Sequence, residues 1–220
     1  MADDADSRGT LPGILPIFPL TGVLLLPRGR LPLNIFEPRY LALFRDAMEG
    51  ERLVGMVQPS DPPIREMNPA VYPLGCAGRI TSFSETEDGR FLVTLTGVSR
   101  FRIREELPLL SDYRRVVAEW DDFTEDRNPN EAGFDRSRLT SGLRNFFAQC
   151  QVQADWSAID QAPGEHLVTS IAMMCPFAPS EKQALLEAKT LGERAHLLTA
   201  LIEMNVSGPP PDPEAGVTRH

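Results

Sequence analysis

Residues 15–40 read LPIFPLTGVLLLPRGRLPLNIFEPRY, and this stretch decides how the chain begins to fold. Its apolar runs at residues 14–20 and 23–26 are short and interrupted by proline and glycine, so they predict neither a membrane span nor a secretory signal. Pro38 then opens a helix over residues 39–48, where apolar residues recur at helical spacing and where proline is tolerated at the first position. Gly50 ends that helix.

The rest of the first half has the pattern of short strands. Alternating apolar and polar residues predict strands at residues 52–58, 79–86, 91–96, 98–105 and 113–120. Asp88-Gly89 predicts a type I′ hairpin turn, in which both central residues have positive φ. Gly97 is expected to turn the chain between two strands, and the five prolines of residues 59–73 exclude a central strand there. Short strands separated by turns indicate a small barrel or sandwich.

The second half has the pattern of helices. Apolar stripes at residues 139–150, 167–174 and 191–202 have the spacing of amphipathic helices. Ser180 with Gln183, and Thr190 with Glu193, are two predicted capping boxes that mark helix starts. Four helices with short connections indicate an antiparallel bundle. The fold class is therefore α+β, with strands first and helices second.

Composition and charge divide the chain in the same way. We predict disordered tails at residues 1–12 and 207–220, a β subdomain over 13–120, a linker over 121–133 and a helical subdomain over 134–206. The formal net charge is −9. Residues 1–120 carry 14 basic and 16 acidic side chains, whereas residues 121–220 carry 8 and 15. This acidic balance counts against nucleic acid or an anionic membrane as the principal partner.

Catalytic motifs are absent from the sequence. It contains no phosphate-binding GxxxxGK[ST], no GxGxxG and no GxSxG. Ser180 and Lys182 lie at a predicted helix start, where capping explains the serine better than a catalytic dyad does. We therefore expect a protein that is not an enzyme and has no catalytic residues and no cofactor.

Metal binding is equally unsupported. The three histidines, residues 166, 196 and 220, have no partners at metal-ligand spacing, and Cys76, Cys150 and Cys175 lie in apolar contexts that favour burial. Four acidic residues gather in the predicted linker without the spacing of a calcium loop, and a solvated linker is the simpler interpretation: Asp121, Asp122, Glu125 and Asp126. Without a targeting signal, a cytoplasmic location is expected.

Two features leave alternatives open. Five arginines could form a stripe that binds RNA, or a solvated sheet face that pairs with neighbouring glutamates: Arg100, Arg102, Arg104, Arg114 and Arg115. The apolar segment at residues 14–26 and the proline-rich loop could present a strand edge or groove to an extended peptide, or be buried in the core.

A family resemblance narrows these readings. Residues 15–20, 23–27 and 31–40 resemble the opening of the Lon protease amino-terminal, substrate-binding domain, with its pattern "P.FPL…V.LP…L.L.IFEPRY". Residues 74–80 and 97–103 resemble its "GC.GRI" and "G..RF.I" strands. Most signature positions can be explained by folding, with Pro38 starting a helix and Phe36 and Tyr40 in the core. The signature residues are Pro19, Leu20, Pro27, Phe36, Glu37, Pro38, Arg39, Tyr40, Gly75, Arg79, Gly97, Arg100 and Phe101.

The resemblance implies a PUA-like β pseudobarrel with one inserted helix, followed by a helical bundle. It implies a module that engages unfolded polypeptide or a proteolysis partner, similar to stand-alone bacterial Lon-domain proteins that lack the ATPase and protease parts. A peptidase label would then be inherited from full-length Lon. RNA binding through the arginine stripe is the alternative function. No membrane partner is expected, and the sequence names no small-molecule ligand.

Overall fold

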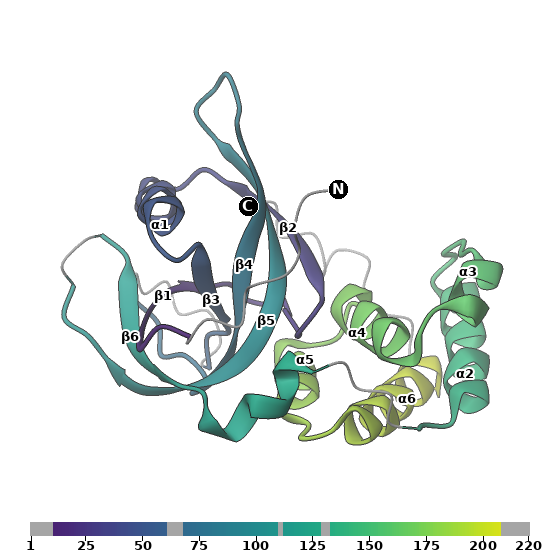
Figure 1. Ribbon diagram of the computed structural model, residues 1–220. Coiled ribbons are helices and arrows are strands. Elements are labelled where there is room, and N and C mark those ends of the chain that lie inside the picture. Colours follow the sequence, from purple (N-terminus) through teal and green to yellow (C-terminus); the bar gives the residue numbers. More distant parts are fainter. Residues whose placement is uncertain (1–10, 61–67, 110–111, 129–132, 208–220) are drawn as a thin grey trace, which may run out of the picture.

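The computed structural model describes residues 11–60, 68–109, 112–128 and 133–207. Its strands are β1 (Ile14–Pro19), β2 (Arg30–Ile35), β3 (Leu53–Val57), β4 (Leu74–Glu85), β5 (Phe91–Glu106) and β6 (Arg114–Glu119). Its helical segments are α1 (Pro38–Glu49), the 3₁₀ segment η1 (Asp121–Arg127), α2 (Arg136–Gln149), α3 (Trp156–Gln161), α4 (Gly164–Met174), α5 (Pro179–Glu187) and α6 (Leu191–Ser207). The expected α+β class is confirmed, with the helices α2–α6 on one side of the sheet (Figure 1).

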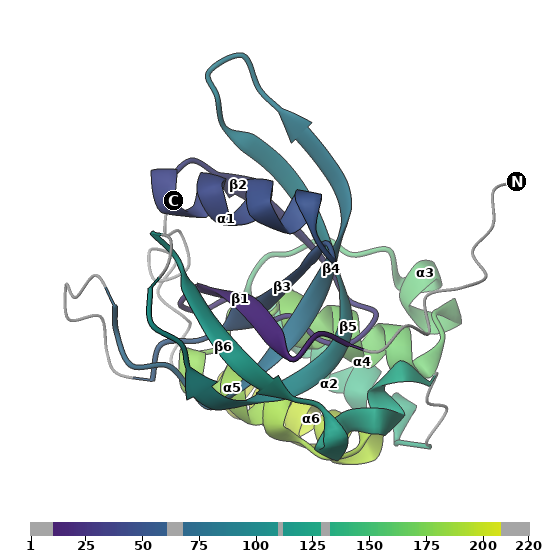
Figure 2. The same ribbon diagram turned by 60° about the vertical axis from the view of Figure 1, so that its left-hand side comes forward.

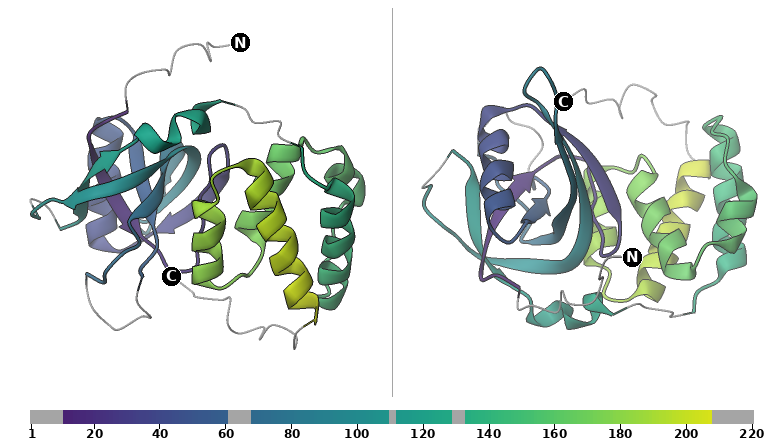
Figure 3. Two further views of the ribbon diagram at one scale, coloured as in Figure 1. Left: turned by 90° about the horizontal axis from the view of Figure 1, so that it is seen from below. Right: turned by 45° about the horizontal axis from the view of Figure 1, so that its top comes forward.

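Five of the six strands close into a ring. The sheet has the order β2-β5-β4-β3-β1-β6, and β5 also pairs with β6, so β5, β4, β3, β1 and β6 form a barrel (Figure 3). β1 is parallel to β3 and antiparallel to β6. β2 lies outside the ring and, within the part of the chain that the structure describes, pairs only with the first half of β5. The barrel thus has one appended strand.

The long strand β5 makes this closure possible. We expected Gly97 to separate two strands, but the structure has one strand through residues 91–106. The register shifts between Ala77↔Ser99 and Gly78↔Gly97 leave Val98 as an extra residue, a β-bulge that bends and twists the strand instead of ending it. Gly97 is required for another reason, because a Cβ there would overlap the carbonyl of Leu26.

The β4–β5 hairpin projects from the barrel (Figures 1 and 2), and its turn differs from the prediction. Gly89 has φ +79°, but Asp88 does not have positive φ, so the turn is not type I′. The backbone N–H of Thr86 donates to the Arg90 carbonyl at 2.9 Å, which closes a loop of the residues between them. Only one left-handed residue is needed in this longer loop.

Helix α1 forms where the sequence predicted it. Pro38 lies in its first turn, and Tyr40, Leu43, Phe44 and Ala47 are buried. The Phe18 ring of β1 lies 4.3 Å from that of Tyr40 between centroids. The helix therefore packs against β1 and β3 as part of the larger hydrophobic cluster (Figure 2).

The helices of the second half largely follow the predicted stripes. α2, α4 and α5 all pack against α6. Thr190 caps α6 as predicted, its Oγ1 accepting from the Glu193 N–H at 3.1 Å. The Ser180 cap was wrong: α5 begins at Pro179, and the Glu181 carboxylate accepts from the Ala178 N–H at 2.8 Å. Helix α3 was not predicted, since its six residues contain no buried side chain and hence no stripe.

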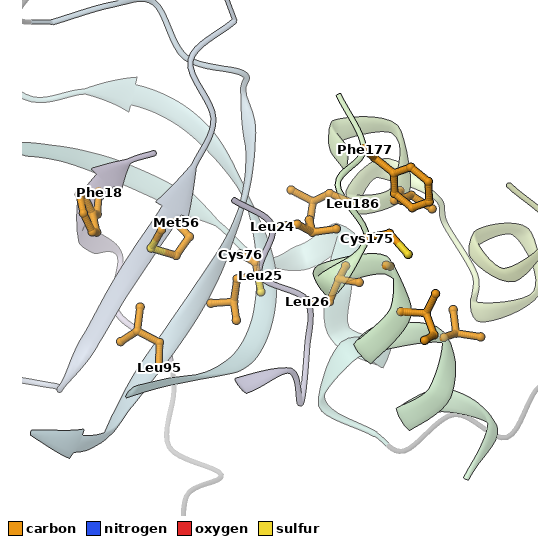
Figure 4. Close-up of a cluster of buried hydrophobic side chains, with 14 of the residues drawn as sticks. Phe18, Leu24, Leu25, Leu26, Met56, Cys76, Leu95, Cys175, Phe177 and Leu186 are labelled. Carbon is orange, nitrogen blue, oxygen red and sulfur yellow. The ribbon is translucent and has the colours of Figure 1, made fainter. Parts of the chain in front are cut away.

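The larger of two hydrophobic clusters runs through both halves of the chain, and the smaller one fills the barrel around Phe101. Leu24, Leu25 and Leu26, between β1 and β2, are buried between the sheet and the helices (Figure 4). On the sheet side they approach Cys76, and on the helix side lies Leu186. Of the two alternatives for the apolar run at residues 23–26, burial in the core is therefore the correct one.

The predicted linker and tails are only partly described. Residues 121–127 form η1, whose Phe123 is buried against the guanidinium of Arg100. Within the predicted amino-terminal tail, the Pro12 carbonyl accepts a hydrogen bond from Trp120 Nε1 at 3.0 Å. Residues 1–10, 129–132 and 208–220 lie outside the described part of the chain. Among the helices that the structure describes, none combines the length and apolar character needed to cross a membrane.

The shared core predicts that the two halves unfold together. Trp156→Phe leaves Trp120 as the one tryptophan, which reports on the barrel, while far-ultraviolet circular dichroism reports mainly on α2–α6. We expect both signals to give the same urea midpoint. Leu24–Leu26 pack against both the sheet and the helices, so unfolding of either half would expose apolar surface of the other. Helices that melt at a clearly lower urea concentration than the barrel would contradict unfolding of the two halves as one unit through the shared cluster.

Candidate binding surface

β2 is the edge strand of the sheet. Its one partner among the described residues is β5, with pairs from Arg30↔Thr96 to Ile35↔Phe91. β1, by contrast, pairs on both sides, so the apolar segment that begins with it offers no free edge. A strand edge is therefore present at residues 30–35, outside the apolar segment 14–26 where it was predicted. Residues 61–67 of the proline-rich loop, the other predicted location, lie outside the described residues.

Proline fixes which backbone groups face this edge. Pro32 has no N–H and lies opposite Thr94, so its nitrogen must point away from β5. In an antiparallel pair alternate residues direct both backbone groups to the same side. Arg30 and Asn34, two residues before and after Pro32, therefore present their N–H and C=O groups at the free edge. Leu31, Leu33 and Ile35 bond to β5.

The outer face beside this edge forms a shallow, open depression. Two cross-strand rows build it, Asn34–Leu92–Ser84 and Pro32–Thr94–Ser82. Its volume is about 500 Å³, and its lining contains no charged residue: Pro32, Leu33, Asn34, Ser82, Ser84, Leu92, Val93 and Thr94. Leu92 is 47% exposed at its floor. The surface can accept backbone hydrogen bonds, hydroxyl contacts and one apolar side chain, but it offers no acid or base.

The arginine stripe is not assembled on one surface. Arg100 is only 4% exposed, and its guanidinium pairs with both carboxylate oxygens of Asp126, at 2.9 and 2.8 Å. It also donates to the carbonyls of Leu186 and Ala188 in and just after α5, at 3.1 and 2.6 Å. Arg100 thus holds β5, η1 and α5 together and is not available to RNA.

Arg114 is also buried. It forms a two-pronged ion pair with Glu106 at 2.7 and 2.6 Å and donates to the Pro69 carbonyl at 2.8 Å. Arg102 is exposed and lies 3.3 Å from Asp122. Of the five arginines in the RNA hypothesis, only Arg102, Arg104 and Arg115 are therefore not buried. Arg102 and Arg104 each face a carboxylate.

The four acidic residues of the predicted linker were all expected to be exposed to solvent, and one of them is buried. Asp121, Asp122 and Glu125 are exposed, but Asp126 is buried against Arg100. No group of three or more potential metal-ligating residues occurs in the ranges that the structure describes. Burial raises the pKa of the Cys76 thiol, and raises that of Cys175 to about 12, so both remain unreactive thiols near neutral pH.

Most signature residues contribute to folding contacts. Gly75 leaves no room for a Cβ beside the Met56 carbonyl, and Phe101 is fully buried. Arg39 pairs with Glu37 at 2.9 Å. Phe36 is the exception, since it is 41% exposed and does not belong to the core as expected. Arg79 Nη1 donates to the Glu51 carbonyl at 3.2 Å. The signature does not mark the depression.

Sequence reasoning did not find the depression. Its residues come from three strands, and none carries a charge or a nucleophile that would draw attention. One signal was present: a proline inside a strand-like run, here Pro32, indicates an edge strand.

The fold is a closed β-barrel with a helical extension and one edge strand, β2, whose outer side has no strand partner among the described residues. Residues 14–204 match the substrate-binding domain of the ATP-dependent protease La (LON) family. The chain belongs to this family.

Comparisons with individual proteins agree. Lon protease 2 of Sorangium cellulosum is 31% identical over 214 residues, which cover 90% of this chain and 25% of that protein. Lon protease 2 of Myxococcus xanthus is 27% identical over 205 residues, covering 89% and 24%. The chain thus spans about a quarter of the length of these relatives.

Two solved structures share the fold. A Lon N-terminal domain protein from Xanthomonas campestris superposes with a TM-score of 0.59 at 22% identity, covering 85% of this chain and 97% of that one. The N-terminal domain of the Mycobacterium avium complex Lon protease gives 0.61 at 15% identity, covering 86% and 97%. The family that matches is a substrate-binding domain and not a catalytic one.

Removing one partner of the buried ion pair should destabilise the fold strongly. Asp126→Asn leaves the Arg100 guanidinium buried without its carboxylate, which costs about 3 kcal/mol in the free energy of unfolding. Urea denaturation measures this difference.

The matched control is Asp122→Asn, which breaks the exposed pair with Arg102 and should cost less than about 1 kcal/mol. Equal losses in the two variants would show that Arg100 does not hold the halves together.

Proposed function

We propose that this chain is a non-catalytic module that binds unfolded polypeptide and delivers or tethers it to a proteolytic partner. The observation that carries the proposal is the open, uncharged depression beside a free strand edge, on a domain of a substrate-binding family. Strand edges recognise extended chains through the backbone, with little dependence on sequence. That matches what unfolded substrates have in common. We propose the cytoplasm as its location.

The physical chemistry of the depression fits such a ligand. Ser82, Ser84 and Thr94 offer hydroxyl groups that can donate or accept, and Leu92 offers apolar area. Covering a half-exposed leucine gains of the order of 1 kcal/mol, which is a modest contribution. Leu92 alone therefore contributes about a fivefold factor in affinity, and the backbone hydrogen bonds of the strand edge must supply the rest.

Binding can be tested with reduced, permanently unfolded casein. Titration followed by fluorescence anisotropy should give saturable binding, and Leu92→Asp should weaken it at least about fivefold, because a carboxylate would be desolvated on the floor of the depression. No binding at high-micromolar protein would overturn the proposed function.

A matched control separates this surface from general stickiness. Val152→Asp changes a side chain of similar exposure in the helical half, on the segment after α2. It should leave casein binding within about twofold of the original. An effect of Val152→Asp as large as that of Leu92→Asp would move the binding surface away from the depression.

A further inference from the structure

The backbone groups at the free edge of β2 determine how an extended polypeptide could bind there. The inference drawn from them rests on the proposed function. Arg30 and Asn34 can each donate and accept one backbone hydrogen bond at this edge, whereas Pro32 can only accept. We propose that an extended, uncharged segment of an unfolded chain adds to the sheet as an antiparallel seventh strand alongside β2, with its backbone bonded to Arg30, Pro32 and Asn34.

The proline selects against a second copy of the chain. If two β2 strands paired antiparallel about Pro32, the two prolines would face each other and neither could donate, so the centre of the ladder would be empty. An unlike segment with an ordinary residue opposite Pro32 retains the hydrogen bond from its own N–H to the Pro32 carbonyl. The edge therefore favours foreign chain over self-association.

The depression beside the edge determines which side chains of the added strand can be accommodated. Alternate residues of an added strand point to the face that carries Asn34, Thr94 and Leu92. No charged residue lines that depression, so a charged side chain opposite Pro32 or Asn34 would lose solvent without gaining a counter-ion. Small polar and apolar residues at alternate positions complement it. Segments of this composition lie in the interior of folded proteins and become accessible when those proteins unfold.

The first part of β2 lies beside helix α4, which limits the added strand. Met173 of α4 occupies the space where a Cβ of residue 29 would lie, so Gly29 is closely covered there. The helix and the beginning of β2 also lie together in Figures 1 and 3. A strand antiparallel to β2 runs toward this covered end. The available edge is thus the short stretch of residues 30–34, which accepts a brief extended segment and not a long sheet.

Proline substitution can remove one backbone donor from the edge without removing a bond to β5. Asn34→Pro deletes an edge-facing N–H at an exposed position, as the chain already does at Pro32. Asn34→Ala is the matched control, since it removes the side-chain amide and keeps the backbone donor. The probe is a short blocked peptide in which Thr and Leu alternate, with unfolded casein in parallel.

We expect Asn34→Pro to weaken the binding of both probes about tenfold, because one backbone hydrogen bond to the added strand is lost. Asn34→Ala should change the affinity less than about twofold. Pro32→Ala restores a donor and should tighten binding about fivefold. It keeps the test decisive if Asn34→Pro does not fold. Circular dichroism checks the fold of each variant.

The outcomes separate the two proposals. If casein binds the unaltered protein but Asn34→Pro and Pro32→Ala leave its affinity unchanged, strand addition at β2 is overturned and the proposed function stands. If neither probe binds the unaltered protein at high-micromolar concentration, both fall. Self-association of the unaltered protein through β2 would overturn the selection against a second copy.

Discussion

The buried guanidinium of Arg100 is the point on which the two halves of the molecule depend. It lies on β5 after the Val98 bulge, pairs with Asp126 of η1 and reaches the carbonyls at the end of α5. A cation at the carboxyl end of a helix meets the negative end of the helix dipole, so the contact stabilises α5 as well as the ion pair. Phe123 covers the same guanidinium, 4.8 Å from the ring centroid. Without this group, the buried Leu186 carbonyl and Oδ1 of Asp126 would each lose the donor that Arg100 supplies.

A second arginine completes the same arrangement. Arg194 of α6 is buried, and its guanidinium donates to the carbonyls of Leu185 and Ala188. Burial lowers the pKa of Arg194 to about 10, which leaves it protonated at neutral pH. Two cations from different halves therefore share the end of α5. Arg100 and Arg194 thus fix the end of α5 to β5 and α6, and among the described residues β2 is left with one side unpaired.

The sequence predicted the class of fold because its signals are local. Pro38 and the apolar stripe after it define α1, and the stripes of α2, α4 and α6 need only the spacing of apolar side chains. Errors arose where a long-range contact overrode a local preference. Gly97 is typical of a turn, but the Leu26 carbonyl requires a residue without a side chain there. Asp88-Gly89 favours a tight turn, yet the loop closes through Thr86 and Arg90.

The candidate site was harder to predict, for two physical reasons. Alternation along a strand cannot tell a solvent-facing arginine from one that a distant aspartate neutralises, so Arg100 and Arg102 looked alike. The depression has no charged group, and its rows join residues up to about sixty positions apart, such as Asn34 and Leu92. Only the sheet register brings them together. The edge character of β2 was readable in principle from Pro32.

Amide hydrogen exchange tests the central claim, that unfolded chain binds along the free edge of β2. In the protein alone, the amides of Arg30 and Asn34 should exchange quickly, while those of Leu31 and Leu33, which donate to β5, exchange slowly. Saturation with the alternating Thr-Leu peptide should slow exchange at Arg30 and Asn34 and leave α2 and α6 unchanged. Peptide-induced protection confined to the helices, with no change at Arg30 and Asn34, would contradict the account.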